Sequence, residues 1–479
     1  MVEQSQVRGA GRVRRGPVLA VLSVASFMAG LDLFIVNVAF TDIGRDFAGE
    51  SMADLSWVLN GYAIAFAALL VPLGRLADRY GRKAGLVLGL TVFTLASQAC
   101  AAAPSLWWLV AFRVVQAAGA AALIPTSLGL LLSAFPAERR GGAVRIWSAA
   151  SAIAAAAGPA VGGVLVDASW RWVFEVNVPI GIAAVLLAAR LVPDSREGAT
   201  ARVPDLAGTA VATAAIALLA LGLVKINDWP GERTTIVVAA ALLGLTWFWL
   251  RSLRHPAPVI EPALLAVRTF FWSNAAVLLF TVAFAANLLL GVLWMQQVWH
   301  YSPIRTGLAV APGPLMVPVM ALIAGRLAAA RVPVGLITAV GCMLCAFGVV
   351  LIAMSLGPAP AYASEMLPGW LVGGTGVGLA LPTILSAAAV ELPSHRYATG
   401  SAVVNMSRQI GAVLGVSLAV AVLGTPHGYP GLHTAYVHAW LMVGAFMVIA
   451  AITALGMTPR RPRPSSPVPE PETEVIARA

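Results

Sequence analysis

The chain has 479 residues, of which 59% are hydrophobic and only 11% are charged, and its formal net charge is +10. Because an average soluble domain carries roughly 25% charged residues, this composition excludes a soluble globular fold. The apolar residues form runs of about 20, the length of a membrane-spanning helix, without the alternating polarity of barrel strands. We therefore predict an all-α integral membrane protein, since a helix satisfies its own backbone hydrogen bonds in lipid.

Fourteen apolar segments follow one another along the chain, and their even number places both ends of the chain on one side of the membrane. We predict spans at 17–40, 55–76, 84–103, 106–132, 143–166, 172–192, 206–226, 234–251, 271–295, 306–327, 332–355, 366–390, 399–424 and 435–457. The basic start of the chain precedes an apolar run that has no small-residue cleavage site, so we expect an uncleaved first helix.

The basic residues test this count, because cytoplasmic loops of membrane proteins are enriched in lysine and arginine. With the N-terminus in the cytoplasm, the inward tails and loops hold 24 of the 31 basic residues. Arg113 and Arg408 fall inside spans, and the five outward residues are Arg45, Arg171, Lys225, Arg233 and Arg305. We therefore predict that both termini are cytoplasmic. The positive charge serves to orient the protein, so no nucleic-acid partner is expected.

Asp32 is the one acidic residue that falls well inside a predicted span. Ionisable groups at membrane depth are costly and usually functional. Burial favours the neutral form of a carboxyl group, whereas a nearby cation such as Arg113 favours the charged form. A carboxyl group balanced between these effects can load and release a proton. The alternative is a static pair with Arg113 or a cap on a helix break.

The inward loop between the second and third spans has a Gly-x3-Asp-x2-Gly-Arg-Lys pattern. A solvated positive loop would explain its arginines but not this spacing, which resembles the loop motif of the major facilitator superfamily. In that family the acid and the arginines latch the two halves together on the cytoplasmic side of the outward-open state. The resemblance implies this role for Gly74, Asp78, Arg79, Gly81 and Arg82. The stretch 325–331 looks like a decayed second copy without the acid, so we expect a one-sided latch.

The fourth span contains Arg113 followed by Val-Val-Gln-Ala-Ala-Gly-Ala. An arginine in an apolar span is expensive unless it is paired or hydrated, or snorkels to the surface. The stretch resembles the superfamily's fourth-helix motif, whose arginine takes part in proton transfer. The resemblance implies that Arg113 and Asp32 together couple transport to protons, with snorkelling toward the outer face as the alternative.

The fifth span contains a Gly-Pro-x2-Gly-Gly sequence made by Gly158, Pro159, Gly162 and Gly163. Proline kinks a helix, and the glycines permit close approach of a second helix. Ordinary kinked packing would explain both. The order of residues resembles the motif of the superfamily's antiporter branch, where it lies between the two halves, and this favours export over import.

The first span, with Asp32 and Asn37, resembles the first-helix motif of the fourteen-spanner drug:proton antiporter family, although Phe34 and Thr41 replace its usual threonine and proline. Stretches at 294–308, 374–382 and 408–411 also resemble this family, so the likeness covers 17–457. It implies two six-helix bundles, 17–192 and 271–457, joined by a linker, 193–270, with two additional transmembrane helices. The tails, 1–16 and 458–479, would be cytoplasmic, the second of them disordered, and the protein a monomer.

The resulting prediction is a proton-coupled antiporter of the bacterial inner membrane that exports hydrophobic or amphipathic small molecules, such as a drug, antibiotic or secreted metabolite, by alternating access. It would use the proton gradient and not ATP, because no nucleotide-binding P-loop is present. We also expect no cofactor, no metal and no catalytic residue. Few acids lie within the spans, so we expect neutral, zwitterionic or anionic substrates. The predicted cavity residues are Asn37, Tyr62, Phe66, Gln116, Asn287, Trp294, Gln297 and Asn405.

Two other functions remain open from the sequence. A proton-coupled importer of a small nutrient would share this architecture, and the motif of the fifth span argues against it. A non-transporting membrane sensor or enzyme is the other alternative. An enzyme would need paired carboxylates, a histidine metal cluster or a nucleophile–base set, and none is evident in the sequence.

Overall fold

The computed structural model describes residues 15–193, 205–392, 397–426 and 428–458. Over these residues it has fourteen helical segments long and apolar enough to cross a membrane, and it contains no strand. The predicted fold class, all-α with fourteen spans, is confirmed. Most of the two predicted tails lies outside the described residues.

The first bundle contains six membrane spans, one of which begins with the short helix α2 and another with α7. Its helices are α1 (Arg15–Asp46), α2 (Met52–Leu55), α3 (Trp57–Tyr80), α4 (Arg82–Ala101), α5 (Leu106–Ala134), α6 (Ala137–Ala168), α7 (Trp172–Glu175) and α8 (Asn177–Leu191). Within it α1 packs on α6, and α5 packs on both α3 and α4. Small residues permit this: a Cβ at Gly119 of α5 would meet the backbone of Phe93 in α4.

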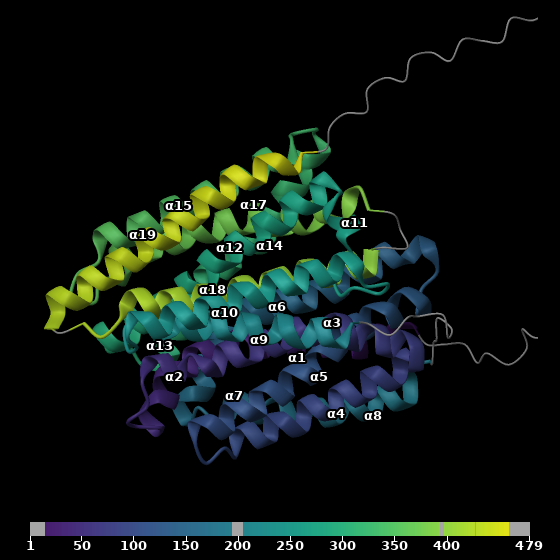
Figure 1. Cartoon of the computed structure of the whole chain (residues 1–479), viewed down its shortest axis with the longest axis horizontal. Coiled ribbons are helices and arrows are strands. Elements are labelled where there is room, and N and C mark those ends of the chain that lie inside the picture. The colour runs from purple at the N-terminus through teal and green to yellow at the C-terminus, as the bar shows by residue number, and fades with distance from the viewer. Residues whose placement is uncertain (1–14, 194–204, 393–396, 427, 459–479) are drawn as a thin grey trace, which may run out of the picture.

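A helical pair and a second bundle follow. The pair consists of α9 (Leu206–Val224) and α10 (Gly231–Arg254), which pack on each other. The second bundle contains α12 (Arg268–Leu293), η1 (Trp294–Val298), α13 (Pro303–Val310), α14 (Pro312–Ala329), α15 (Val334–Ser355), α16 (Tyr362–Glu365), α17 (Leu367–Val390), α18 (Tyr397–Leu423), α19 (Gly428–Ala454) and η3 (Leu455–Met457), preceded by α11 (Pro262–Leu265). In Figure 1 the helices α12, α14, α15, α17 and α19 lie above those of the first bundle.

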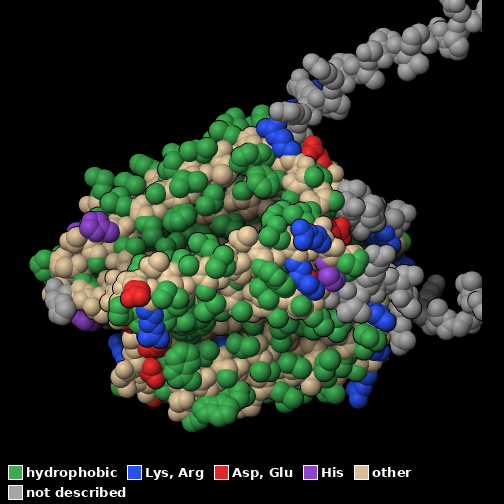
Figure 2. All heavy atoms as spheres, in the orientation of Figure 1, with side chains coloured by type: hydrophobic (Ala, Val, Ile, Leu, Met, Phe, Trp, Pro, Cys, Tyr) green, Lys and Arg blue, Asp and Glu red, His purple; other side chains and the backbone are tan. Residues whose placement is uncertain are grey.

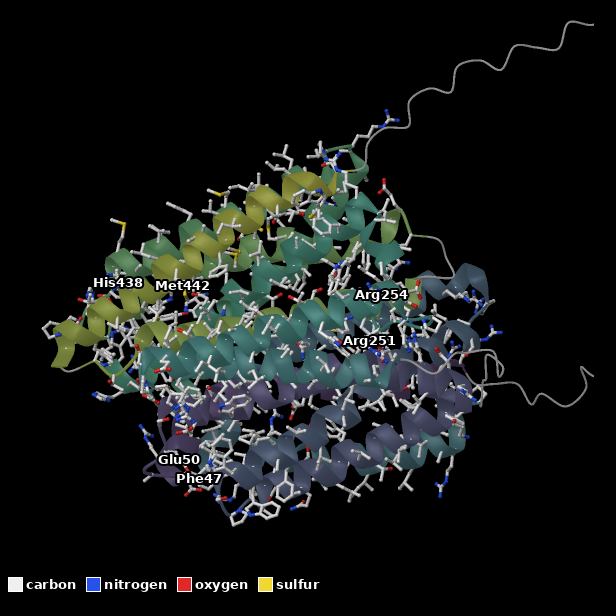
Figure 3. The ribbon with its side chains drawn as sticks, viewed as in Figure 1. Phe47, Glu50, Arg251, Arg254, His438 and Met442 are labelled. Carbon is white, nitrogen blue, oxygen red and sulfur yellow. The ribbon has the colours of Figure 1, made fainter. Side chains whose placement is uncertain are left out.

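The helices run side by side between two ends of the molecule. The first residue of α1 and the last residue of η3 lie at the same end of the molecule, which we call the terminal end. We call the opposite end of the molecule the distal end. Figure 3 shows Arg251 and Arg254 at the terminal end and Phe47 and Glu50 at the distal end. On the face seen in Figure 2, Lys and Arg side chains gather mainly at the terminal end, and a broad hydrophobic band lies between the ends.

The pair α9–α10 lies against the seam between the bundles. Helix α9 contacts α3 of the first bundle and α18 of the second. At the distal end, Lys225 Nζ lies 3.0 Å from Asp54 Oδ1, and the Asn227 amide donates to the Ala421 carbonyl at 2.7 Å. The turn between α9 and α10 is therefore bonded to both bundles.

Helix α1 continues to Asp46, six residues beyond its predicted end at 40. Thr41 occupies the place where the resemblance would put a proline, and unlike proline it can donate its backbone N–H to the helix. The extension brings Asp42 within 3.1 Å of Arg45 on the last turns.

Candidate functional site

A cavity lies between the two bundles. Its walls come from α1, α3 and α5 on one side and from α12 and α18 on the other, and its empty volume, part of it open to solvent, is about 660 Å³. The lining is formed by Leu33, Phe34, Asn37, Leu59, Asn60, Ala63, Arg113, Thr281, Phe284, Ala285, Leu288, Arg408, Gln409, Ala412 and Val416. Its composition is mainly apolar, with two arginines and no carboxylate.

The bundles meet at the distal end of this cavity. Helix α6 packs closely against α13, whereas it scarcely touches α14, which continues from α13 toward the terminal end. The Asn60 amide of α3 also donates a hydrogen bond to the Ser417 hydroxyl of α18 at 3.1 Å. The cavity is thus closed at the distal end, and α6 and α14 separate toward the terminal end.

A buried polar network lies behind the wall of the cavity. One oxygen of Asp32 lies 2.5 Å from Arg113 Nη1, and the other accepts a hydrogen bond of 2.8 Å from the Gln116 amide. Arg113 also donates to the Gln116 side-chain oxygen and, through Nε, to the Val58 carbonyl. Asp32 is 0% exposed and Arg113 is 1% exposed. Because an unpaired charge at this depth would be costly, these partners allow both charges to remain inside the bundle.

Aromatic rings complete the surroundings of Arg113. Its guanidinium carbon lies 4.1 Å from the centre of the Tyr62 ring, in reach of a cation–π interaction, and Phe66 stacks on Tyr62 with the ring centres 6.1 Å apart. The two rings belong to the core of the first bundle. Of the groups in this network, only Arg113 is part of the cavity lining, so Asp32 is connected to the cavity through its ion pair with Arg113.

The predicted latch loop contacts both the first bundle and the linker, where Arg75 Nη2 lies 3.7 Å from Glu261 Oε1. Gly81 has φ = +126°, which an L side chain rarely adopts, and it separates α3 from α4. Asp78 accepts a hydrogen bond of 2.6 Å from Arg82, the Arg79 guanidinium lies over the Tyr80 ring, and Gly74 faces Pro125 of α5. These contacts do not reach the second bundle, and the latch role of Gly74, Asp78, Arg79, Gly81 and Arg82 stays a prediction.

The glycine–proline motif of α6 lies where α1, α6 and α13 meet. A Cβ at Gly158 would lie 2.8 Å from the Phe34 Cβ, and one at Gly162 would lie 2.9 Å from the Ile35 side chain. Gly163 faces the backbone of Pro303 in the second bundle, and the Pro159 carbonyl faces Gly307. These residues therefore lie at the junction of the bundles, and the glycines leave the space that the junction needs.

The predicted cavity residues have separate locations. Asn37 is part of the lining, while Gln116, Tyr62 and Phe66 lie in the network behind it. The others are bonded within the second bundle: Asn287 accepts from Trp440, Gln297 from Tyr436, Trp294 packs on Tyr436 and Trp440, and Asn405 accepts from Arg408. In this conformation these seven lie outside the lining.

Several lining residues were not predicted, notably Asn60, Phe284, Arg408 and Gln409. Arg408 could have been found, since the cost of an intramembrane arginine that drew attention to Arg113 applies equally to it. The others carry no such signal, because an asparagine or phenylalanine in an apolar span is compatible with many positions.

Fourteen spans in two bundles around a central, mostly apolar cavity define a polytopic membrane transporter. The model of the Major Facilitator Superfamily matches residues 22–416, and the chain belongs to this superfamily. Its members are transporters, so this protein is a membrane transporter of small molecules and not an enzyme, as predicted.

Comparisons with related proteins agree with this assignment. The chain is 34% identical to the multidrug resistance protein Stp of Mycobacterium tuberculosis over 83% of this chain and 74% of that protein. It is 33% identical to the cephamycin export protein CmcT of Amycolatopsis lactamdurans over 94% and 95% of the two chains, and 32% identical to a probable actinorhodin transporter of Streptomyces coelicolor over 86% and 72%.

Solved structures share the fold. A bacterial homologue of the lysosomal transporter Spinster superposes with a TM-score of 0.65 at 15% identity, covering 93% of this chain and 97% of that one. A POT peptide transporter in complex with sulfate superposes with a TM-score of 0.66 at 15% identity, over 92% and 94%.

Proposed function

We propose that the protein is a proton-coupled antiporter that exports hydrophobic or amphipathic small molecules by alternating access, with the proton gradient as its energy source and no cofactor. The observation that carries the proposal is the Asp32–Arg113–Gln116 network, a fully buried acid joined to an arginine on the wall of the central cavity. Protonation of an acid in this position weakens its bond to Arg113, which links proton binding to the shape of the cavity.

Alternating access gives the network two environments. In the structure the distal end is closed and Asp32 is paired. We propose that in the opposite state, open at the distal end, Asp32 receives a proton and releases Arg113. The protonated acid has less need of its counter-charge, so the protein can return without substrate. Release of the proton at the terminal end restores the pair and completes one exchange.

The direction of transport is supported by the relatives and by one motif. The related proteins are described as exporting cephamycin or as conferring resistance to drugs, methylenomycin A or puromycin. The antiporter-type motif at Gly158–Gly163 lies at the junction of the bundles, where the distal closure forms. We therefore propose export of a drug, antibiotic or secreted metabolite in preference to nutrient import.

We further propose that the terminal end faces the cytoplasm, as the distribution of basic residues predicts. The cavity of this structure would then face inward, in position to receive a cytoplasmic compound. In the outward-open state the loop with Asp78 and Arg82 would exchange its internal ion pair for contacts to the second bundle. The protein would act as a monomer in the bacterial plasma membrane.

The proposal is tested with inverted membrane vesicles in which a proton gradient, acidic inside, drives uptake of a panel of antibiotics. Wild type should accumulate at least one compound, and Asp32→Asn should lose the gradient-dependent part. Asp42→Asn is a matched control, because Asp42 lies on the same helix but is bonded to Arg45 near the distal end. Gradient-driven uptake that survives in Asp32→Asn would rule out the proton role of Asp32.

A further inference from the structure

The charges on the cavity wall are unbalanced. The lining contains Arg113 from the first bundle and Arg408 from the second, and it contains no aspartate or glutamate. Arg113 is neutralised by Asp32 from behind the wall. Arg408 donates one hydrogen bond, at 3.2 Å, to the Asn405 side-chain oxygen on its own helix, and no carboxylate among the described residues pairs with it.

An arginine of this kind needs a source of negative charge. A guanidinium group has five N–H donors, and one is engaged by Asn405 in the described part of the chain. Removing a cation from water without a counter-ion is expensive in a protein within a bilayer. Arg408 remains on the wall of a partly open cavity, where a solute can approach it. The site is therefore suited to an anion that arrives with the substrate.

Gln409 provides a second polar group next to Arg408. It is 6% exposed, it lines the same cavity, and its amide has no hydrogen-bond partner among the described residues. The neighbouring polar side chains already have hydrogen-bond partners, since Thr281 donates to the Val277 carbonyl and Asn60 donates to Ser417. Arg408 and Gln409 together therefore present unused N–H donors to one region of the cavity, which is what an oxyanion requires.

The remaining wall is apolar and partly aromatic. Phe34 of the first bundle and Phe284 of the second meet edge to face with ring centres 6.3 Å apart, and Phe280 stacks on Phe284. Leu33, Leu59 and Leu288 extend this surface. A ligand that fits both regions has an aromatic or otherwise apolar body and one acidic group.

We propose that Arg408 and Gln409 form an anion subsite, and that the exported compounds are amphipathic organic anions such as aromatic carboxylates. The statement that these compounds are exported rests on the proposed function, whereas the anion subsite itself does not depend on proton coupling. It narrows the substrate class expected from the sequence, because neutral and cationic compounds leave Arg408 without a counter-charge. A cationic drug would in addition be repelled by Arg408.

The test compares matched pairs of ligands that differ in one group. Naphthalene-1-acetate and larger aromatic carboxylates are each paired with their primary amides, which have nearly the same shape but no charge. Equilibrium binding is measured on the full chain in lipid nanodiscs, without a proton gradient. Wild type should bind carboxylates at least about tenfold more tightly than the amides, since a charge-assisted pair in a low dielectric is strong.

Three variants assign this preference to the subsite. Arg408→Gln should reduce the preference to less than about threefold, and Arg408→Lys should retain part of it because the charge is kept. Gln409→Leu should weaken carboxylate binding more than amide binding. Arg305→Gln is the matched control, since Arg305 lies near the distal end over the Tyr301 ring and outside the cavity lining.

Two results overturn the proposal. The first is that wild type prefers the carboxylate in none of the ligand pairs, which includes the case that it binds none of the ligands. The second is that the preference for the carboxylate survives in Arg408→Gln. The variant Asp32→Asn distinguishes failure of the anion subsite from failure of the proposed function. If its gradient-driven transport is normal while the carboxylate preference of wild type depends on Arg408, the proton assignment fails and the subsite stands. If Asp32→Asn loses transport while no carboxylate preference exists, the subsite fails alone.

Discussion

The side chains of Asn60 and Ser417 form a hydrogen bond of 3.1 Å between the two bundles, although 357 positions separate them in the sequence. Both side chains are 0% exposed, and the bond joins α3 to α18 where the cavity is closed. Opening of the distal end must separate these helices and break the bond. Asn60 and Ser417 therefore stabilise the distally closed state relative to the distally open one.

Replacement of this hydrogen bond should shift the conformational equilibrium. A typical buried hydrogen bond contributes about 0.5–1.5 kcal/mol, so Ser417→Ala should raise the distally open fraction by about two- to tenfold. The measurement is the rate at which a membrane-impermeant maleimide, added from the distal side, labels Val416→Cys in the cavity lining. The native cysteines, Cys100, Cys342 and Cys345, are buried and give a low background. An unchanged labelling rate would show that the bond does not contribute to closure.

Replacement of Gly163 by a larger residue should cause a steric clash where the two bundles meet at the distal end. A Cβ at this position would lie 2.5 Å from the Pro303 carbonyl oxygen of the second bundle, too close for the backbone to accept without movement. Gly163→Ala should therefore disfavour the closed state by about 1–3 kcal/mol and slow export at least about fivefold. Gly142→Ala is the control, since it lies on the same helix and has no atom within 4 Å of its Cβ position. Equal export rates for both variants would contradict the prediction.

The Asp32–Arg113 pair predicts that stability and coupling can be separated. Arg113→Met leaves Asp32 buried without its cation, and removal of one partner of a buried pair costs about 3–5 kcal/mol. The double variant Asp32→Asn/Arg113→Met removes both charges of this pair and should regain most of the lost thermal stability, measured as the unfolding temperature in detergent. It should still lack gradient-driven transport. Recovery of transport in the double variant would contradict the role of Asp32.

Asp205 predicts a dependence of stability on pH in the α9–α10 pair. Burial raises the pKa of this carboxyl group, but hydrogen bonds from Arg251 and the Gly208 N–H, with the charges of His255 and Arg251, lower the pKa overall below its ordinary 3.8. Arg251 Nε and Nη2 lie 2.7 and 3.0 Å from the two oxygens, joining the start of α9 to the end of α10. A lowered pKa contributes stability above 3.8 that is lost as the pH falls through the folded-state value.

Asp205→Asn isolates this contribution, because asparagine can still cap α9 through its side-chain oxygen. The variant should unfold at a lower temperature than wild type at neutral pH, and the difference should shrink as the pH falls below 3.8 and through the lowered pKa of Asp205 in the folded state. Thermal unfolding in detergent at several pH values measures it. A difference of the same size at both extremes would show that the charge of Asp205 contributes nothing.

The number of spans could be predicted from the sequence, because the length of an apolar run and the cost of exposing backbone groups to lipid are local properties. The buried acid and its partner could be proposed for a similar reason: Asp32 and Arg113 are costly at membrane depth unless each has a counter-charge. Helix ends were less certain, as the six-residue extension of α1 shows, because Thr41 is compatible with both a helix and its end.

The composition of the cavity wall could not be predicted in the same way. Tyr62, Trp294 and Asn287 looked suitable for a cavity by residue type, yet they are engaged by Arg113, Tyr436 and Trp440. Each residue on a transmembrane helix can face lipid, its own bundle or the other bundle. Sequence composition does not distinguish the last two when the helix is apolar all round.

The sequence by itself determined that this chain crosses the membrane fourteen times and carries one acid and two arginines at membrane depth, since hydropathy and charge act residue by residue. Only the tertiary structure decided that Arg113 turns to Asp32 while Arg408 faces the cavity without a carboxylate partner among the described residues. The physical reason is that counter-charge depends on distances between helices far apart in the chain. Those distances follow from the packing of α1 with α5 and of α18 with α3 and α12.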